Sequence, residues 1–337
     1  MSSDVTSRIG MAPVGRRVRA YVAPVDRGSE RPAIFDPGKH GCFPLDAPPS
    51  PWIDVGWIEN FRRASTSVID EVRTGPQGSI SVQFRRTVGA SVELDFCDWG
   101  KLQMAISAGT QHMNVLGVDP NSEDEPMGGT PVAPFAVLPG STIQEIILGP
   151  GAVDSFAIGD LVAVDVDYQQ QVGYVGTGIA AAYVSDPADI FSDVNYIRRV
   201  TFNVGCVKGK TATSLLLDQP MPGGAPAAMS AAQKVVGFVD RDGGNFLQEW
   251  SALFVAGEES GGRICYYYPR LRPGRTLGST GKSPLGNTPE SQYALIGTLS
   301  RVALHGTFVA LPWRDGIDNE QIVCYRSYFP ARFSPLY

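Results

Sequence analysis

Apolar and polar residues alternate with a period of two along much of this sequence, and that pattern most constrains its fold. In residues 79–85, Ile80, Val82 and Phe84 alternate with polar side chains. Successive side chains of a β-strand point to opposite faces, so the segment is predicted to be a half-buried antiparallel strand. Its three apolar side chains are expected to face a core.

Residues 91–96 repeat this alternation. The inward-facing residues are predicted to be Val92, Leu94 and Phe96, and the outward-facing ones Glu93 and Asp95. Between the two segments, residues 88–90 are interpreted as a turn because they contain a glycine, so the segments are predicted to form a hairpin. A further strand is predicted at 67–74, followed by a turn at 75–78 whose glycines can adopt positive φ.

One short helix is predicted after these strands. Asp98 is the candidate N-cap and Gly109 the residue that stops the helix. The apolar residues that would share one helical stripe are Trp99, Leu102, Ala105 and Ile106. We expect this helix to cover one face of a sheet.

The length of 337 residues suggests two domains, since a domain usually has about 100–200 residues. Prolines are frequent in residues 1–50, which are predicted to form an extended arm. Residues 109–140 are interpreted as a long loop, and 141–222 as an inserted small β-barrel domain that ends in a linker at 221–226. The assigned domains are 1–50, 51–140, 141–222 and 223–337, with the second and fourth forming one domain.

Four longer strands are predicted after the linker, and they are rich in aromatic residues. Their ranges are 246–255, 263–268, 301–311 and 321–329. Between the second and third of them lies a Pro/Gly-rich loop, 269–291, of a length that is usually functional. An assembly contact is one such function. The fold class predicted from all these elements is mainly β.

Composition excludes several classes of protein. Apolar residues make up 43% of the chain and charged residues 18%, which allows a substantial core without metals or disulfides. The formal charge of -6 argues against a duplex nucleic-acid binder, which needs clustered Lys and Arg. No apolar run is long enough to cross a bilayer and no secretion segment opens the sequence, so the expected location is the cytoplasm.

Motifs for nucleotides and metals fail on spacing. The stretch 278–283 resembles a phosphate loop, but Thr276 stands where the pattern needs glycine. The stretch 173–178 does not match a dinucleotide fingerprint. Three histidines, His40, His112 and His305, are not spaced with other ligands as metal sites require. We therefore expect no cofactor and no metal.

The sequence signals for catalytic groups are equally weak. Cys265 or Cys324 could pair with His305, but nothing in the sequence indicates a lowered thiol pKa. Asp165 and Asp167 lie two apart on a predicted strand at 156–168, where they could present carboxylates to a cation or a sugar. The same spacing is also typical of an ordinary solvated strand face. The five cysteines are interpreted as structural thiols, and the chain is predicted not to be an enzyme.

The order of three early segments resembles the opening of phage major tail proteins, which form tail tubes. These segments are the run 51–61, which contains Asp54-Val-Gly-Trp-Ile58, the residues 72–75 followed by the predicted hairpin, and the helix region 97–109. The late stretches 248–254, 266–270 and 302–311 resemble that family too. Together they cover about two thirds of the chain.

The resemblance implies a β-sandwich or barrel of antiparallel strands with one short helix, and six subunits joining into rings that stack as a tube. It also implies self-association, contacts with a tape measure protein and other tail proteins, and transient passage of DNA. The protein would then be a virion tail component assembled in the host cytoplasm. Glu93 and Asp95 would be candidates for an acidic lumen, and 141–222 would be an added outer domain.

Three other interpretations stay open. The chain could be a carbohydrate-binding or adhesive β-protein that uses Trp313 and Tyr328 as a sugar platform. It could be a hydrolase with paired acids, for example Asp165 and a distant carboxylate. Within the phage interpretation, a distal tail or tube-cap protein would have the same fold.

Overall fold

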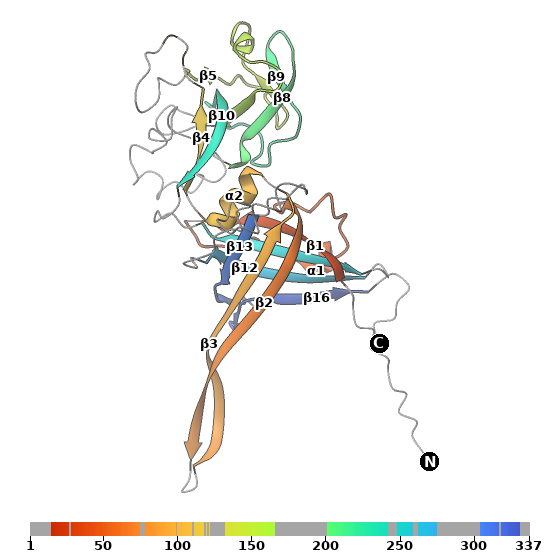
Figure 1. The fold of residues 1–337 in the computed structure, drawn as a ribbon, viewed down its shortest axis with the longest axis vertical. Helices are drawn as coiled ribbons and strands as arrows, with labels where there is room; N and C mark the ends of the chain where they lie inside the picture. The colour runs from red at the N-terminus through yellow and green to blue at the C-terminus, as the bar shows by residue number, and fades with distance from the viewer. Residues whose placement is uncertain are drawn as a thin grey trace, which may run out of the picture. The chain divides into compact units, whose positions relative to one another are not determined.

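The structure is a computed structural model that describes residues 15–26, 28–74, 78–98, 100–109, 111–117, 119, 121, 132–165, 201–241, 248–258, 262–274, 304–316 and 318–330 (Figure 1). The described chain is mainly β with antiparallel strand pairing, which confirms the predicted fold class. It divides into two compact units. Unit 1 comprises Met1–Val25, Glu30–Gly109 and Gln248–Tyr337, and unit 2 comprises Asp26–Ser29 and Thr110–Leu247.

Unit 1 is built on one seven-stranded sheet, whose order is β11-β1-β2-β3-β13-β12-β16. The strands are β1 (Gly15–Pro24), β2 (Ile53–Thr74), β3 (Ser79–Phe96), β11 (Trp250–Glu258), β12 (Arg263–Pro273), β13 (Leu304–Ala310) and β16 (Tyr325–Phe329). In addition, β11 pairs with β12, so six strands form a closed circuit and β16 is added to the side of β12. Closure leaves each of the six strands with a partner on both sides over at least part of its length.

The inside of this circuit is apolar. Its buried side chains come from all six strands and from helix α2 (Lys101–Ala108), and include Val22, Leu94, Phe96, Ile106, Trp250, Phe254 and Phe308. Val92, Leu94 and Phe96 are all buried, as predicted. The helix ends at Gly109, as predicted, with φ of 58°. The prediction of Asp98 as N-cap is wrong, because Gly100 holds that position without a side-chain cap.

A second apolar cluster lies on the other face of β1, β11 and β12. Residues 28–52, which include the short helix α1 (Pro37–His40), contribute Phe35, Phe43 and Trp52 to it. The hydroxyl groups of Tyr21 and Tyr267 donate to the carbonyl oxygens of Leu45 and Ala33, at 2.7 and 2.8 Å. This segment is therefore fixed to the sheet by aromatic packing and by hydrogen bonds.

The prediction of an extended arm at 1–50 is wrong for residues 15–24, which form β1 between β11 and β2. Alternate β1 residues are buried in the two different clusters, with Ala20 and Val22 on one side and Tyr21 and Ala23 on the other. A strand buried on both faces has no polar alternation, which is why the pattern did not reveal it. Pro24 ends this strand and does not interrupt it.

The predicted hairpin between 79–85 and 91–96 is also wrong, because both segments belong to the single strand β3 of 18 residues. Its partner is β2, a strand of 22 residues that includes the predicted strand 67–74. Pairing runs from Ile58 and Phe96 to Thr74 and Ser79. The connection between the two strands therefore falls at 75–78, where the turn was predicted. Gly78 has φ of 63°, and residues 75–77 lie outside the described set.

Unit 2 has its own seven-stranded sheet, in the order β4-β10-β7-β8-β9-β6, with β5 also paired to β10. The strands are β4 (Gln111–Leu116), β5 (Phe135–Ala136), β6 (Glu145–Ile147), β7 (Leu161–Asp165), β8 (Val204–Lys210), β9 (Ser214–Leu217) and β10 (Ala231–Arg241). A 3-10 helix, η1 (Ala152–Ser155), precedes β7. Among the described residues the strand path is open, so the pairing does not show the predicted small barrel.

Unit 2 extends beyond the predicted insert at both ends. Strand β4 lies in the stretch interpreted as a loop, and β10 lies beyond the predicted linker and pairs with β7. Met221, which opens that linker, is buried in the unit 2 core with Val162 and Leu217. The segment 221–226 is therefore a set of turns inside one unit. Proline and glycine indicate turns, but they do not distinguish a turn within a domain from a linker between domains.

The four late strands agree with the structure in position. β11, β12 and β13 fall within or overlap the first three predicted ranges, and the fourth range divides into β15 (Gln321–Ile322) and β16. β15 pairs with β14 (Trp313–Arg314). Most of the predicted loop 269–291 lies outside the described residues. No helix that the structure describes is both long enough and apolar enough to cross a membrane.

Candidate interaction surface

Strands β2 and β3 continue well beyond the sheet as a two-stranded ribbon. Strand β1 pairs with β2 only as far as Ile58, and β13 pairs with β3 only over Ala90–Phe96. Past these points β2 and β3 pair only with each other within the described chain, and Figure 1 shows the pair projecting as a narrow hairpin. We call residues 61–74 and 79–89 the ribbon. Each of its strands has one edge without a backbone partner in the described structure.

One face of the ribbon is mainly apolar. Val72 lies directly opposite Val82, and Phe84 lies opposite Asp70 on the same face. Six large apolar side chains of the ribbon are between 43% and 55% exposed: Val68, Ile69, Val72, Ile80, Val82 and Phe84. Of these, Ile69 lies on the other face, opposite Arg85. Scattered exposed apolar residues are normal, but a group of them on one narrow element with two open edges is typical of a surface that another chain covers.

The opposite face of the ribbon is polar. Glu71 accepts hydrogen bonds from Arg73 at 2.7 Å and from Gln83 at 2.9 Å, and the three side chains share this face. On the apolar face, Arg86 lies 3.6 Å from the Asp70 carboxylate. These contacts are exposed and contribute little to stability. The ribbon is thus amphipathic. Its base packs on the sheet through Phe61 and Arg63, which contact Phe254 and Tyr268, while the side chains farther out are exposed.

The predicted inward orientation of Ile80, Val82 and Phe84 is therefore wrong, because these side chains are between 46% and 54% exposed. A period of two reveals which residues share a face but does not reveal whether a second layer exists. Two signals in the sequence could have identified the ribbon. The alternation continues from 79 to 96 past a single glycine, and the turn at 75–78 alone is sufficient to pair two long strands.

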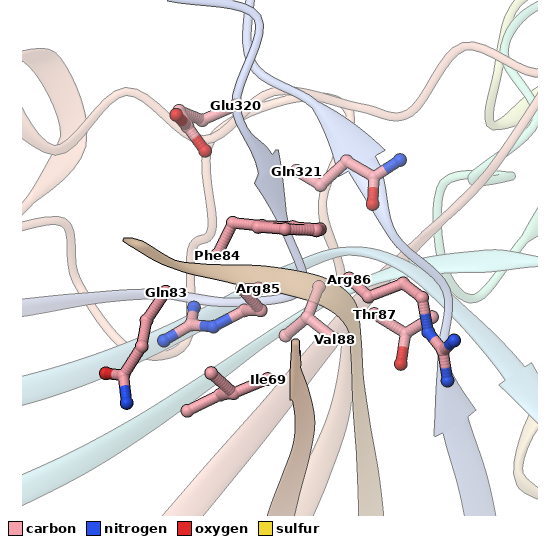
Figure 2. A pocket seen from close by; sticks show the side chains of 9 residues that line it. All are labelled: Ile69, Gln83, Phe84, Arg85, Arg86, Thr87, Val88, Glu320 and Gln321. Carbon is pink, nitrogen blue, oxygen red and sulfur yellow. The ribbon is translucent and has the colours of Figure 1, made fainter. Parts of the chain in front are cut away.

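A hollow of about 370 Å³ lies beside the β3 edge of the ribbon. Its lining residues are Ile69, Gln83, Phe84, Arg85, Arg86, Thr87, Val88, Glu320 and Gln321. Figure 2 shows Phe84 and Ile69 on opposite sides of strand β3, with Glu320 and Gln321 on the Phe84 side. The hollow is open and lined by mixed residues, so it is suited to receiving side chains from a protein surface.

The predicted acidic residues Glu93 and Asp95 share one face of β3, as expected, but their environments differ. Glu93 is exposed and lies opposite Arg62 of β2 and Thr307 of β13. Asp95 is half-buried and receives a hydrogen bond of 2.6 Å from Asn60. Only Glu93 is therefore a fully exposed carboxylate.

Asp95 and His305 meet across β3 and β13, with Oδ1 of the acid 2.7 Å from Nδ1 of the imidazole. His305 Nε2 lies 3.2 Å from the Thr307 hydroxyl oxygen. This confirms that His305 is a hydrogen-bonded sheet residue. An acid, a histidine and a hydroxyl also form hydrolytic triads. Thr307 does not line either of the two hollows named here, the one beside the ribbon and the one inside the sheet.

The second acidic pair, Asp165 and Asp167, lies only partly within the described residues. Asp165 ends β7, where its backbone pairs with Ala231, and Asp167 lies outside the described residues. Ala163, two residues before Asp165 on β7, is buried. The stretches 173–178 and 278–283 also lie outside the described residues. Within the described chain no three His, Cys, Asp or Glu side chains form a group able to hold a metal ion.

The two candidate nucleophilic thiols, Cys265 and Cys324, have raised pKa values. Burial raises the pKa of Cys265 to about 12, and burial also raises the pKa of Cys324. A catalytic thiol needs a lowered pKa, so neither cysteine matches the nucleophile considered from the sequence. Cys42 is exposed, and none of the five cysteines forms a disulfide. For the sugar platform, Trp313 is half-buried on β14 and Tyr328 is 43% exposed on β16, which are separate elements.

Comparisons with known proteins identify no family. No protein-family model matches the sequence, and no curated protein matches it significantly.

Proposed function

We propose that this protein is a structural subunit that assembles with copies of itself into a tube, as phage tail tube proteins do. The observation that carries the proposal is the amphipathic ribbon. An isolated two-stranded hairpin is at best marginally stable in water, and its open edges readily pair with other chains. A second copy that covers the apolar face and pairs with the edges would remove both problems.

The closed sheet of unit 1 supports the same proposal. Its six strands enclose a packed core, so the folded subunit provides a rigid base for the ribbon. The surfaces of unit 1 proposed to act in the assembled tube are the ribbon and the polar face around Glu93. In the proposed tube, Glu93 contributes an acidic charge to the lumen, where repulsion would let DNA pass without binding. Asp95 belongs to the same face but is already engaged by Asn60 and His305.

The proposed partners are other copies of the chain, a tape measure protein inside the tube and other tail proteins at its ends. The proposed location is the virion tail, assembled in the host cytoplasm. A distal tail or tube-cap protein of the same fold is distinguished by how it assembles. A tube subunit stacks without limit as its concentration rises, whereas a cap forms one closed ring.

Negative-stain electron microscopy across a concentration series, with light scattering in parallel, tests the proposal. The expected result is hollow tubes of uniform diameter. A protein that stays strictly monomeric at high concentration would contradict self-assembly. A chain that stops at single rings would favour the cap.

A shortened variant tests whether the ribbon causes assembly. Deleting residues 68–87 and joining Ser67 to Val88 through Asn-Gly retains the native pair Ser67–Val88 and supplies a two-residue turn. This variant should fold and remain monomeric. A matched control removes exposed apolar side chains from unit 2 by Ile158→Ser and Met229→Ser, which are 70% and 91% exposed. The control should assemble like the wild type.

A further inference from the structure

The two free edges of the ribbon carry opposite charges. The β2 strand contributes Asp70 and Glu71, and the β3 strand contributes Arg85 and Arg86. The two pairs are offset by about two residues along the ribbon, because Asp70 and Glu71 lie opposite Phe84 and Gln83, and Arg85 lies opposite Ile69. Arg73 of β2 pairs with Glu71 at 2.7 Å, so the β2 edge keeps a net negative charge over 70–73, while the β3 edge is positive at 85–86.

From this asymmetry we infer that the ribbon is a head-to-tail connector, in which the β3 edge of one subunit pairs with the β2 edge of the next. The inference rests on the proposed self-assembly and names its contact surface. Ribbons that point the same way place β3 beside the neighbour's β2 in antiparallel orientation, with strands about 4.8 Å apart. Arg85 and Arg86 then lie diagonally across from the neighbour's Glu71 and Asp70, a separation that long side chains can bridge.

The alternative contacts are disfavoured by charge. Joining two β3 edges would bring four arginines together, and joining two β2 edges would bring together four carboxylates and only two arginines, the two copies of Arg73. Charges across an interface fix orientation and reject wrong partners more than they add affinity.

The hollow beside the β3 edge fits the same contact. It lies along Gln83–Val88, which includes both arginines, and Glu320 and Gln321 bound its other side. A β2 strand arriving at this edge brings apolar side chains next to its acidic pair, namely Ile69 and Val72. The open space of about 370 Å³ is large enough to receive such a side chain.

Charge exchange tests the inference. One double variant, Arg85→Glu with Arg86→Glu, makes both edges acidic, and another, Asp70→Arg with Glu71→Arg, makes both edges basic. Each alone should raise the concentration needed for assembly at least about tenfold at low salt. A 1:1 mixture should restore assembly, since each acidic edge then meets a basic edge of the other variant.

The mixture separates contacts between chains from contacts within one chain. Each double variant also loses the internal approach of Arg86 to Asp70, and mixing cannot restore that. Far-UV circular dichroism and thermal melting establish that each variant is folded. The milder pair Arg85→Gln with Arg86→Gln should show a smaller rise of the same kind. A matched control, Arg31→Glu with Lys39→Glu, reverses two exposed basic charges outside the ribbon and should assemble normally.

The outcomes that overturn the inference are distinct from those that overturn the proposed function. If wild-type chains form tubes and either double variant does so equally well, the charged edges are not the contact, and self-assembly still holds. If folded variants fail to assemble singly and also fail when mixed, head-to-tail edge pairing is wrong. If the wild type does not assemble at all, both proposals fail.

Discussion

At the scale of single residues, the five thiols should differ in reactivity. Cys42 is exposed, whereas Cys265 is buried and its pKa is raised to about 12 by that burial. A raised pKa reduces the thiolate fraction at every pH below it, and the thiolate is the reactive form. At pH 8 a maleimide should therefore modify Cys42 rapidly and leave Cys265 unmodified in the folded protein, as mapped by peptide mass spectrometry.

Unfolding provides the control for this prediction. In denaturant all five thiols should react, and Cys42→Ser should remove the fast site while leaving the others unchanged. Rapid modification of Cys265 in the folded protein would mean that the cluster beneath residues 28–52 opens to solvent.

Gly109 should be hard to replace. It ends α2 with φ of 58°, and an added Cβ would lie 2.5 Å from Pro273 side-chain atoms. Non-glycine residues are disfavoured at positive φ, and a proline ring cannot rotate away. Gly109→Ala should lower the free energy of unfolding by about 1–3 kcal/mol in chemical denaturation.

Gly257→Ala is the matched substitution for that measurement, because Gly257 has no atoms within 4 Å of an added Cβ. Its effect should stay within about 1 kcal/mol. Equal effects at the two positions would show that the contact with Pro273 is not maintained in solution.

At the scale of elements, β3 is one strand in two environments. Phe96 is 3% exposed inside the closed sheet, while Phe84 is 50% exposed on the ribbon. Phe96→Ala should cost about 3–5 kcal/mol of unfolding free energy because it leaves a cavity. Phe84→Ala should change that free energy by no more than about 1 kcal/mol but weaken assembly. Denaturation of dilute monomer measures the first quantity, and light scattering measures the second.

The comparison of these two phenylalanines is internal to one strand, so residue type and backbone are matched. A large loss of monomer stability from Phe84→Ala would show that the ribbon folds back onto its own chain. Unchanged assembly in the same variant would remove the apolar face from the proposed contact.

How far the sequence could predict these elements depends on their surroundings. Period-two alternation correctly placed Glu93 and Asp95 on the face of β3 that points away from Leu94. The prediction succeeded here because the Leu94 face is covered by the core. The same rule failed for Val82, because coverage depends on a second layer that alternation does not encode. It also missed β1, where both faces are buried and the alternation is absent. The head-to-tail surface depends on pairing register, which only the structure supplies.

At the scale of the whole molecule, strand partners are far apart in sequence. β1 pairs with β11, so Tyr21 lies opposite Leu253, and residues 110–247 separate the segments that build unit 1. The sequence predicted an interrupted domain from strand blocks on both sides. It placed the borders at 140 and 223 because proline and glycine are frequent there, whereas unit 2 begins at Thr110 and ends at Leu247.

Unit 1 should therefore fold without unit 2. Replacing residues 111–247 by a flexible Gly/Ser linker of about 15 residues keeps α2, the closed sheet and the ribbon intact. If pairing edges are what drive assembly, the shortened chain should still form tubes under the electron microscope, because the edges and the hollow belong to unit 1. A folded but monomeric product, judged by its near-UV circular dichroism and light scattering, would mean that unit 2 supplies a necessary contact and that the ribbon alone is insufficient.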